Sequence, residues 1–325
     1  MADKNKSWKT ISFVGLIQVV ASFTIILSVI TLLGQHHRYI ELFSHFKYQY
    51  FISSITCAVI FLFYKKYKFT MTLILVAALN FVFIAPWYIQ KFETKLTNEY
   101  IDLTILHSNV LTSNVEFEEF INLVNQQNPD VFVMQEVNQN WLSNIQVLEK
   151  SYPYKHTMPR EDNFGIALIS KFPLISAKNH SSGAFDIPTI LATILIKKQL
   201  VTIITSHPLP PVNYEYYQAR NSQLNMIAEL SKNIQGPLIL VGDLNVSMWS
   251  HHYWPLEAET GLRNARKGFG ILPTWPTQFL LPMLMIPIDH VLISSHFEVH
   301  DIKAGKDIGS DHLPLIVKLS IKTIE

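Results

Sequence analysis

A short apolar stretch that ends in two polar side chains carries the strongest chemical signal of the sequence. Residues 238–241 are all apolar, Gly242 follows, and Asp243 and Asn245 come next with one residue between them. Because residues two apart in a strand point to the same face, the carboxylate and the amide would look into one space. A carboxylate can hold a hard cation or take a proton from water, and an amide can hold an anionic oxygen without adding charge. The pair therefore suits phosphoester chemistry, although a lone Gly-Asp-x-Asn is more often an Asx turn that closes a strand.

Further apolar segments also end in residues that can bind a metal ion or move a proton. These residues are Asn109, Glu136, His207, Asp289 and the adjacent pair Asp311 and His312. Each alone is more often structural, because a lone His is usually only hydrogen-bonded and a lone Asp usually caps a turn. If the strands form two packed sheets, however, their ends meet at one edge and build one acidic pocket. That pocket would repel a phosphate unless a divalent cation lay between them, and carboxylates and amides without Cys suit Mg²⁺ or Mn²⁺.

Apolar strands and amphipathic helices would position these residues. Periodicity predicts strands over 102–110, 131–136, 164–170, 191–196, 200–205, 238–241 and 288–293. Helical spacing of apolar residues predicts helices over 116–127, 141–148 and 214–234. The part between Asn245 and residue 288 reads as a long irregular stretch. Its uncharged segment at 279–287 is either a loop folded onto the core or a hydrophobic rim that dips into a membrane.

The first ninety residues are more apolar than the rest, which accounts for a mean hydropathy of +0.19. Uncharged runs predict three transmembrane helices at about 11–34, 48–64 and 69–89. The first run is too long for the core of a signal peptide, and no small-residue cleavage site follows it. Buried helices of a soluble domain are the alternative, but such helices need polar faces, which these runs lack. We therefore expect a membrane anchor over 1–89, a linker over 90–100 and a catalytic domain over 101–325.

Lysines in the short segments beside these runs set the expected orientation. They are Lys4, Lys6 and Lys9 before the first run, and Lys65, Lys66 and Lys68 between the second and the third. Positive charge is retained on the cytoplasmic side, so the N-terminus should lie inside and the catalytic domain outside a multi-pass inner or plasma membrane. From residue 101 onward acidic residues outnumber basic ones. That part lacks the excess of Lys and Arg expected of a protein that binds nucleic acid non-specifically.

In order and spacing, the motifs resemble the endonuclease/exonuclease/phosphatase superfamily, which includes pancreatic-type deoxyribonuclease, apurinic endonuclease, neutral sphingomyelinase and inositol-polyphosphate 5-phosphatase. The resemblance rests on Asn109, Gln-Glu at 135–136, His207, Gly-Asp-Leu-Asn at 242–245, Ile-Asp-His at 288–290 and Ser-Asp-His at 310–312. It covers the chain from about Asp102 to the end. The three apolar runs, Asn-Phe-Gly-Ile-Ala at 163–167 and Gly-Ile-Leu-Pro-Thr-Trp-Pro at 270–276 are similar to bacterial membrane-anchored members.

The resemblance implies an α/β fold and metal-dependent hydrolysis of a phosphoester. The fold would be a four-layer sandwich, in which two packed, mainly antiparallel β-sheets are flanked by helices. Glu136 would bind Mg²⁺, with Mn²⁺ as the alternative ion, helped by Asn109 and Asp311. Asp243 would position or deprotonate the attacking water, and Asn245 would hold a phosphoryl oxygen as charge builds on it.

Further roles come from the same resemblance. His312 would bind the phosphate or transfer a proton, and Asp289 would orient it through a hydrogen bond. His207 matches a histidine of the deoxyribonuclease and sphingomyelinase branches, where it stabilises phosphoryl oxygens or protonates the leaving group. Arg160 and Asn163 precede an expected strand and are candidates for substrate contact, with a solvated loop as the alternative.

The expected partners are a lipid bilayer and a phosphoester substrate, which is a phospholipid headgroup, a nucleic acid or a small phosphoester. No stable protein partner is inferred. A catalytically inactive binding or scaffold module of the same fold is the alternative function, although every expected catalytic position is filled.

Overall fold

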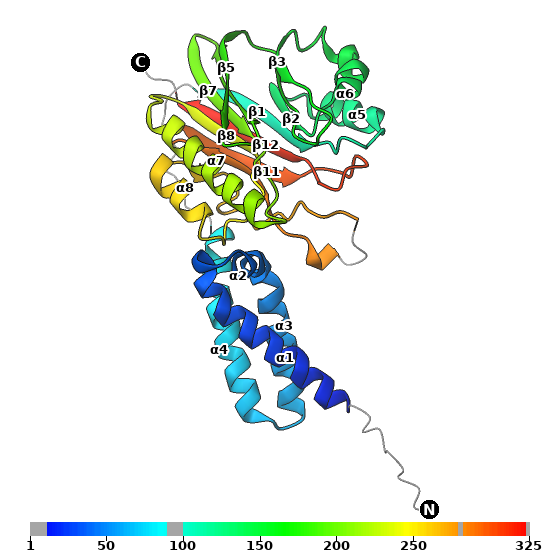
Figure 1. The fold of residues 1–325 in the computed structure, drawn as a ribbon, viewed down its shortest axis with the longest axis vertical. Helices are drawn as coiled ribbons and strands as arrows, with labels where there is room; N and C mark the ends of the chain where they lie inside the picture. The colour runs from blue at the N-terminus through cyan, green and yellow to red at the C-terminus, as the bar shows by residue number, and fades with distance from the viewer. Residues whose placement is uncertain (1–11, 90–99, 279–281, 323–325) are drawn as a thin grey trace, which may run out of the picture. The chain divides into compact units, whose positions relative to one another are not determined.

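The computed structural model describes residues 12–89, 100–278 and 282–322, and it divides the chain into two compact units, Met1–Ile84 and Ala85–Glu325. The first unit is helical (Figure 1). It comprises α1 (Phe13–Ile30), η1 (Thr31–His36), α2 (Arg38–Phe43), η2 (Ser44–Phe46), α3 (Lys47–Phe63) and α4 (Tyr67–Ile84). The helical stretches Phe13–His36, Arg38–Phe63 and Tyr67–Trp87 are long and apolar enough to cross a membrane. The second stretch begins earlier than the predicted residue 48, because α2 and η2 precede α3.

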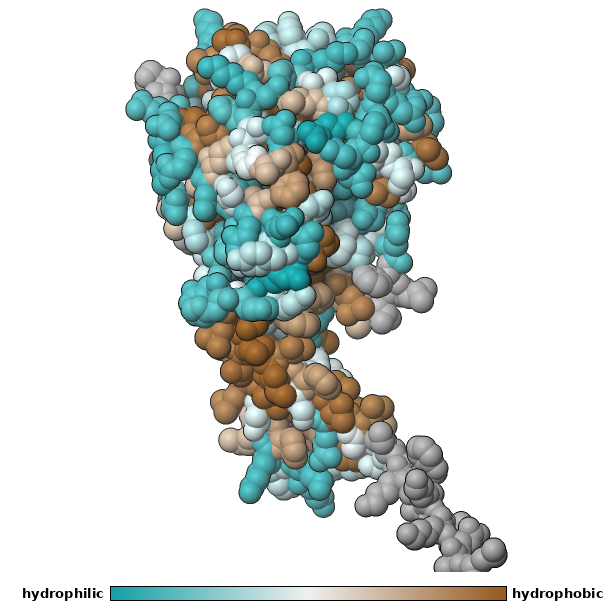
Figure 2. Space-filling model, viewed as in Figure 1, coloured by the Kyte–Doolittle hydropathy of each residue, from teal (hydrophilic) through white to brown (hydrophobic). Residues whose placement is uncertain are grey.

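Polar side chains join the helices of the first unit from within. Asn80 donates to Ser28 Oγ at 3.0 Å, the Thr24 and Ser53 hydroxyls lie 2.8 Å apart, and Lys47 donates to Thr31 Oγ1 at 2.7 Å. Large apolar side chains such as Phe23, Leu75 and Val82 are exposed. Figure 2 shows that much of the surface of this unit is hydrophobic. An apolar exterior around hydrogen-bonded contacts between helices is typical of helices packed in a bilayer.

The division between the two compact units falls between Ile84 and Ala85. The short helix η3 (Ala85–Trp87) belongs to the second unit. There the Trp87 carbonyl accepts hydrogen bonds from the Gly268 and Gly270 amides at 3.0 and 2.7 Å. The linker predicted at 90–100 lies outside the described residues, except for Tyr100, which begins β1.

The second unit contains two six-stranded sheets. Sheet A has the order β11–β12–β1–β2–β4–β3 and comprises β1 (Tyr100–Asn109), β2 (Val131–Gln135), β3 (Tyr154–Met158), β4 (Ile166–Ser170), β11 (Phe297–Ala304) and β12 (Leu315–Lys322). Sheet B has the order β5–β6–β7–β8–β10–β9 and comprises β5 (Leu174–Ser182), β6 (Ile187–Ile196), β7 (Gln199–Ser206), β8 (Leu238–Asp243), β9 (Arg263–Asn264) and β10 (Asp289–Ile293). Among these described strands, β1 with β2 and β7 with β8 form the parallel pairs. The sheets are therefore mainly antiparallel, as predicted.

Helices cover the outer faces of the sheets and complete four layers (Figure 1). The helices are α5 (Phe117–Gln127), α6 (Gln139–Asn144) and η4 (Ile145–Leu148) on sheet A, and α7 (Tyr214–Lys232) and α8 (Tyr253–Thr260) on sheet B. In β2, Val131 and Val133 enter the core between the sheets, whereas Phe132 and Met134 enter the core beneath α5 and α6. Because successive residues of a strand face opposite sides, a strand buried on both faces needs an uninterrupted apolar run.

One expectation for the elements was wrong. α8 lies in the stretch that was predicted to be irregular. Pro255 hides this helix in the sequence, yet proline is tolerated in a first turn, where the amides have no partner within the helix. The helical stretch predicted over 141–148 is present as α6, which is followed directly by the tighter turn of η4.

The uncharged segment at 279–287 is described only in part, because 279–281 lie outside the described residues. The short helix η5 (Pro282–Leu284) exposes 59% of Met283 and 36% of Leu284, whereas Ile286 is buried. Ile286 forms an isolated β-bridge with Trp275. The segment is therefore part core and part exposed apolar surface.

Gln135, at the end of β2, joins the two sheets. Its Nε2 donates to the Ser206 carbonyl of β7 at 2.6 Å, and its Oε1 accepts from the Asp243 amide of β8 at 2.7 Å. A Cβ at Gly242 would lie 2.1 Å from the Ser206 carbonyl oxygen and 2.4 Å from Gln135 Nε2. The bridge between the sheets therefore requires glycine at position 242.

We expect Gly242→Ala to destabilise the second unit by about 2–3 kcal/mol, because the methyl group must move a backbone carbonyl or break the Gln135 bridge. The measurement is thermal unfolding of the full-length protein in detergent, followed by tryptophan fluorescence. Gly183→Ala is the matched control, because a Cβ there meets nothing within 4 Å and only the strain of a φ of +74° is added, about 1–2 kcal/mol. An unchanged midpoint for Gly242→Ala would show that the bridge tolerates the methyl group.

Candidate active site

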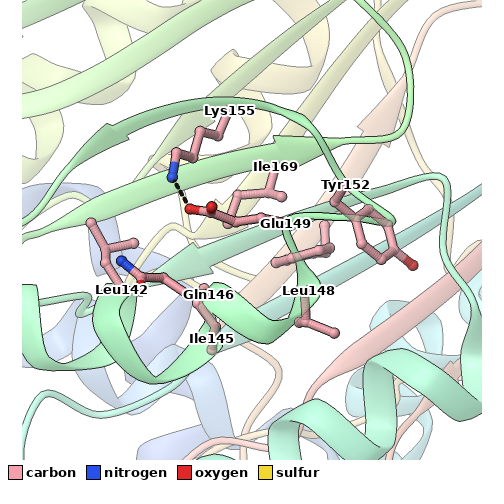
Figure 3. Close-up of a pocket in the computed structure, with 9 residues that line it drawn as sticks. Leu142, Ile145, Gln146, Leu148, Glu149, Tyr152, Lys155 and Ile169 are labelled. Carbon is pink, nitrogen blue, oxygen red and sulfur yellow. Dashed lines mark hydrogen bonds and ion pairs between the residues drawn. The ribbon is translucent and has the colours of Figure 1, made fainter.

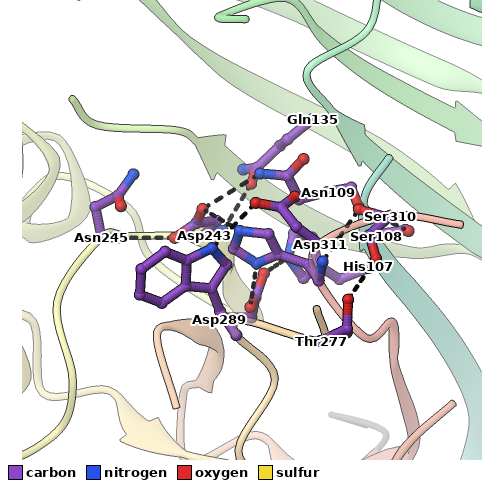
Figure 4. Close-up of polar contacts among 12 residues, drawn as sticks. His107, Ser108, Asn109, Gln135, Asp243, Asn245, Thr277, Asp289, Ser310 and Asp311 are labelled. Atoms are coloured by element: carbon purple, nitrogen blue, oxygen red, sulfur yellow. Dashed lines mark hydrogen bonds and ion pairs between the residues drawn. The ribbon is translucent and has the colours of Figure 1, made fainter. Parts of the chain in front are cut away.

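The polar residues at the strand ends converge at one edge of the two sheets (Figure 4). In sheet A, Asn109 at the end of β1 pairs in register with Gln135 at the end of β2, and Glu136 follows. In sheet B, Asp289 at the start of β10 pairs with Asp243 at the end of β8. Because β10 runs antiparallel to β8, its first residue reaches the same edge as the last residue of β8.

Asp243 lies at the centre of this cluster and is only 1% exposed. Its Oδ2 is 3.3 Å from His207 Nε2, 3.5 Å from His312 Nε2 and 3.3 Å from Asn109 Nδ2. Its Oδ1 accepts a hydrogen bond from the backbone N–H of Asn245 at 2.9 Å. Burial opposes a charge on His207, but the hydrogen bond and the charge of Asp243 raise the pKa of this histidine. Two imidazoles and an amide thus share one carboxylate oxygen.

Asp289 is fully buried and contacts two histidines. His312 Nδ1 lies 2.8 Å from Oδ2, the orienting contact expected from the sequence, and His107 Nε2 lies 2.7 Å from Oδ1. Burial opposes ionisation of Asp289, but the charge of His312 and the hydrogen bond from His107 hold the pKa of this carboxyl well below its usual range. Burial also opposes a charge on His312, yet Asp289 and Asp243 raise its pKa to about 10. The two carboxylates thus favour the imidazolium form of His312.

The remaining carboxylates have fewer partners. Burial raises the pKa of Glu136, an effect that His207 and Asn109 reduce and Asp311 increases. Asn109 Nδ2 donates to Glu136 Oε1 at 3.0 Å, whereas Asn109 Oδ1 accepts from the Leu111 amide at 3.1 Å. Asp311 Oδ1 is buried and has no hydrogen-bond partner among the described residues. A raised carboxyl pKa and an unpaired carboxylate oxygen, close together, fit a divalent cation between Glu136 and Asp311.

A second group of ligand atoms lies next to these carboxylates. Asp243, Asp289 and His312 offer atoms within 4.8 Å of one another and could also hold a metal ion. In that group, however, His312 directs Nδ1 at Asp289 and Nε2 at Asp243. A metal ion there would displace the contacts that orient His312. We therefore favour Glu136 and Asp311 as the charged metal ligands.

Two residues that touch the site were not found from the sequence. His107 lies two residues before Asn109 and on the same face of β1, so the period of a strand was an available signal. Trp275 donates from Nε1 to Asp311 Oδ2 at 3.1 Å, and its ring centroid lies 6.3 Å from that of His312. The motif at 270–276 marked the position of Trp275 but gave no indication of its partner.

Arg160 and Asn163, the candidates for substrate contact, lie in a loop whose contacts are mainly local. Arg160 Nε donates to Asp162 within the same loop at 2.9 Å. Asn163 is exposed, with a left-handed φ of +67°. Phe164 instead faces the site, since its ring centroid lies 5.5 Å from that of His207. Contacts between described residues therefore link Phe164, rather than Arg160 or Asn163, to the cluster.

Asn245 occupies a constrained turn after β8. Its φ is +50°, its Nδ2 donates to the Pro208 carbonyl at 2.9 Å, and its own carbonyl accepts from Arg220 Nη1 at 3.0 Å. The side-chain amide of Asn245 thus lies beside Pro208, the residue that follows His207. That position is compatible with the predicted role toward a phosphoryl oxygen.

A small cavity lies beneath α6 and η4, lined by residues that include Leu142, Ile145 and Tyr152 (Figure 3). Its volume is about 30 Å³, room for about one or two water molecules. The ion pair of Lys155 with Glu149 lies at its rim. None of its lining residues belongs to the cluster around Asp243, so we do not consider it a substrate site.

The sequence profile of the Endonuclease/Exonuclease/phosphatase family matches residues 107–312. No curated protein matches the sequence. The solved structures that share the fold include the following three. D. rerio TDP2 complexed with single strand DNA product has 15% identity and a TM-score of 0.56, over 67% of this chain and 98% of that chain. An endonuclease/exonuclease/phosphatase family protein from Bacteroides thetaiotaomicron has 16% identity and a TM-score of 0.56, over 70% of this chain and 97% of that chain. The human Nocturnin catalytic domain with bound sulfate anion has 18% identity and a TM-score of 0.55, over 69% of this chain and 98% of that chain.

Glu136 should reduce the stability of the metal-free protein. Its φ of +60° strains a non-glycine backbone, and its raised pKa means that folding disfavours the ionised side chain. We expect Glu136→Gly to raise the thermal midpoint of the EDTA-treated, full-length protein and to abolish the further rise on adding Mg²⁺. Glu136→Gln is the matched control, because it removes the charge and keeps the strained backbone. If Mg²⁺ stabilises Glu136→Gly as much as the wild type, Glu136 is not a metal ligand.

Proposed function

Because the chain belongs to the endonuclease/exonuclease/phosphatase family, we propose that it is a membrane-anchored, metal-dependent phosphoester hydrolase. The observation that supports this most is the environment of Asp243. Its Oδ2 lies within 3.5 Å of a ring nitrogen of both His207 and His312. A carboxylate between two imidazoles can accept a proton from water while a neighbouring imidazolium donates one.

In the proposed reaction, Asp243 positions a water molecule and takes its proton as the water oxygen bonds to phosphorus. His312, an imidazolium oriented by Asp289, binds a phosphoryl oxygen and offsets its growing charge. His207 donates a proton to the leaving oxygen as its bond to phosphorus breaks. Asn245 donates a hydrogen bond to a second phosphoryl oxygen.

Glu136, Asp311 and Asn109 would hold Mg²⁺, with Mn²⁺ as the alternative ion. A divalent cation held there would add positive charge beside the phosphate and offset the carboxylates of Glu136 and Asp311. Asn109 now directs its Nδ2 at Glu136 and Asp243. It would therefore have to rotate its amide to offer an oxygen to the cation.

Three substrate classes fit this chemistry, namely phospholipid headgroups, nucleic acids and small phosphoesters. The acidic excess after residue 101 disfavours nucleic acid. Exposed Met283 and Leu284 favour a lipid surface, because Thr277 of the same loop donates its amide to the Asp311 carbonyl at 3.0 Å and so connects them to the site. Parallel hydrolysis assays on phospholipid vesicles, oligonucleotides and a nitrophenyl ester distinguish the three classes.

We expect Asp243→Asn and His312→Ala each to lower hydrolysis of bis(4-nitrophenyl) phosphate by about 100-fold or more, because each removes a proton-transfer or charge-stabilising group. EDTA should abolish wild-type turnover, and Mg²⁺ should restore it. The measurement is nitrophenol release by the full-length protein in detergent. Asp102→Asn, at an exposed position of β1, is the control and should keep the wild-type rate. Turnover that survives both EDTA and Asp243→Asn would contradict the proposal, and no turnover of any phosphoester would favour the scaffold alternative.

The distribution of lysines before and between the apolar helices supports a cytoplasmic N-terminus and an extracytoplasmic catalytic unit. We expect alkaline phosphatase fused after Glu325 to be active and a fluorescent protein fused there to be dark, because each reporter folds on only one side of a bacterial inner membrane. Fusions after Tyr64 serve as the control and should give the opposite result. Fluorescence without phosphatase activity after Glu325 would reverse the topology.

A further inference from the structure

The Asp289 carboxylate is shared by two histidines, of which only His312 has a place in the proposed reaction (Figure 4). We propose that His107 is a positioning residue that fixes the rotation of the Asp289 carboxylate and, through it, the ring of His312. This inference rests on the proposed function for its catalytic consequence. Its structural part concerns only the three side chains His107, Asp289 and His312.

Strand pairing fixes the backbone positions of His107 and Asp289. His107 pairs with Leu315 of β12 on one side and with Val133 of β2 on the other, so it lies inside sheet A. Asp289 pairs with Asp243 in sheet B. The contact of 2.7 Å between His107 Nε2 and Asp289 Oδ1 therefore crosses from one sheet to the other. Neither residue can shift without moving a paired strand.

A carboxylate rotates about its last torsion with broad, nearly two-fold preferences, so one hydrogen bond does not define its orientation. With His107 on Oδ1 and His312 on Oδ2, both oxygens of Asp289 are engaged and the plane of the carboxylate is set. Asp289 is fully buried, so without the donor at position 107 its Oδ1 would have no hydrogen-bond partner. Rotation toward another donor would then relieve this cost and move Oδ2 away from His312.

The ring of His107 is suited to this single task. Its Nδ1 is buried and has no hydrogen-bond partner among the described residues, so Nε2 supplies its polar contact there. Arg266 contacts Asp289 as well, but Nη2 donates to the Asp289 backbone carbonyl at 2.6 Å. Arg266 thus holds the main chain of Asp289, and the two histidines hold its carboxylate.

The alternative is that His107 only fills space between the sheets. His107→Gln keeps an N–H donor at about the reach of Nε2, whereas His107→Leu keeps apolar bulk without a donor. A space-filling role predicts that both variants lose activity only in proportion to the fraction unfolded. A positioning role predicts a loss in His107→Leu that His107→Gln reverses.

The experiment uses full-length protein in detergent, with ¹⁵N-labelled histidine. We expect the His312 Nδ1–H resonance, assigned by its loss in His312→Gln, to disappear or broaden in His107→Leu and to persist in His107→Gln. With bis(4-nitrophenyl) phosphate as the probe, kcat should fall about tenfold or more in His107→Leu at an unchanged KM, and it should stay within about threefold of wild type in His107→Gln. Thermal melts confirm that each variant is folded, and His107→Met replaces His107→Leu if the latter does not fold.

The outcomes separate this inference from the proposed function. A wild-type resonance and rate in folded His107→Leu would overturn it, and so would equal losses in the Leu and Gln variants. If the wild type hydrolyses no phosphoester but the resonance behaves as expected, the proposed function fails and the positioning contact stands.

Discussion

The Gln135 side chain bonds to two strands of the opposite sheet, and the candidate site depends on the relative position that these bonds fix. The site draws Asn109 and Glu136 from sheet A, and Asp243 and Asp289 from sheet B. Apolar packing between sheets is non-directional, so it does not define their alignment alone. Hydrogen bonds have preferred lengths and angles, and Gln135 makes one to each of β7 and β8. This buried amide therefore aligns the two halves of the site.

The charges of the site are not evenly compensated. Asp243 and Asp289 each contact two imidazoles, so buried negative charge there lies against groups that can be positive. Glu136 receives hydrogen bonds from the neutral Asn109 amide, and Asp311 from the neutral Trp275 indole. Uncompensated negative charge therefore lies at Glu136 and Asp311, whereas the imidazole groups lie at Asp243 and Asp289. This asymmetry is what a cation and a phosphate, bound side by side, would require.

The residues at the strand ends could be predicted from the sequence because their signal is local. Asp243 and Asn245 follow an apolar run directly, although β8 ends at Asp243 and Asn245 lies in the turn after it, where its backbone amide donates to Asp243 Oδ1. His107 and Gln135 have equally local positions, but their partners are distant, since Asp289 lies 182 residues after His107. No periodicity reports such a pairing. α8 was missed for the opposite reason, because the local signal of Pro255 is a helix breaker while its position in the first turn makes it harmless.

The strand order of sheet A bears on how the protein is made. The first strand of the second unit, β1, pairs along its length with β12, from Tyr100 with Lys322 to His107 with Leu315. As the chain emerges from the ribosome, the three apolar helices of the first unit are complete while β1 still lacks this neighbour. One edge of β1 stays open for the synthesis of more than two hundred residues, and an open edge invites pairing with other chains. Translation of β12 is thus the event that completes the pairing of β1, and a chain arrested before it would present an unpaired strand edge.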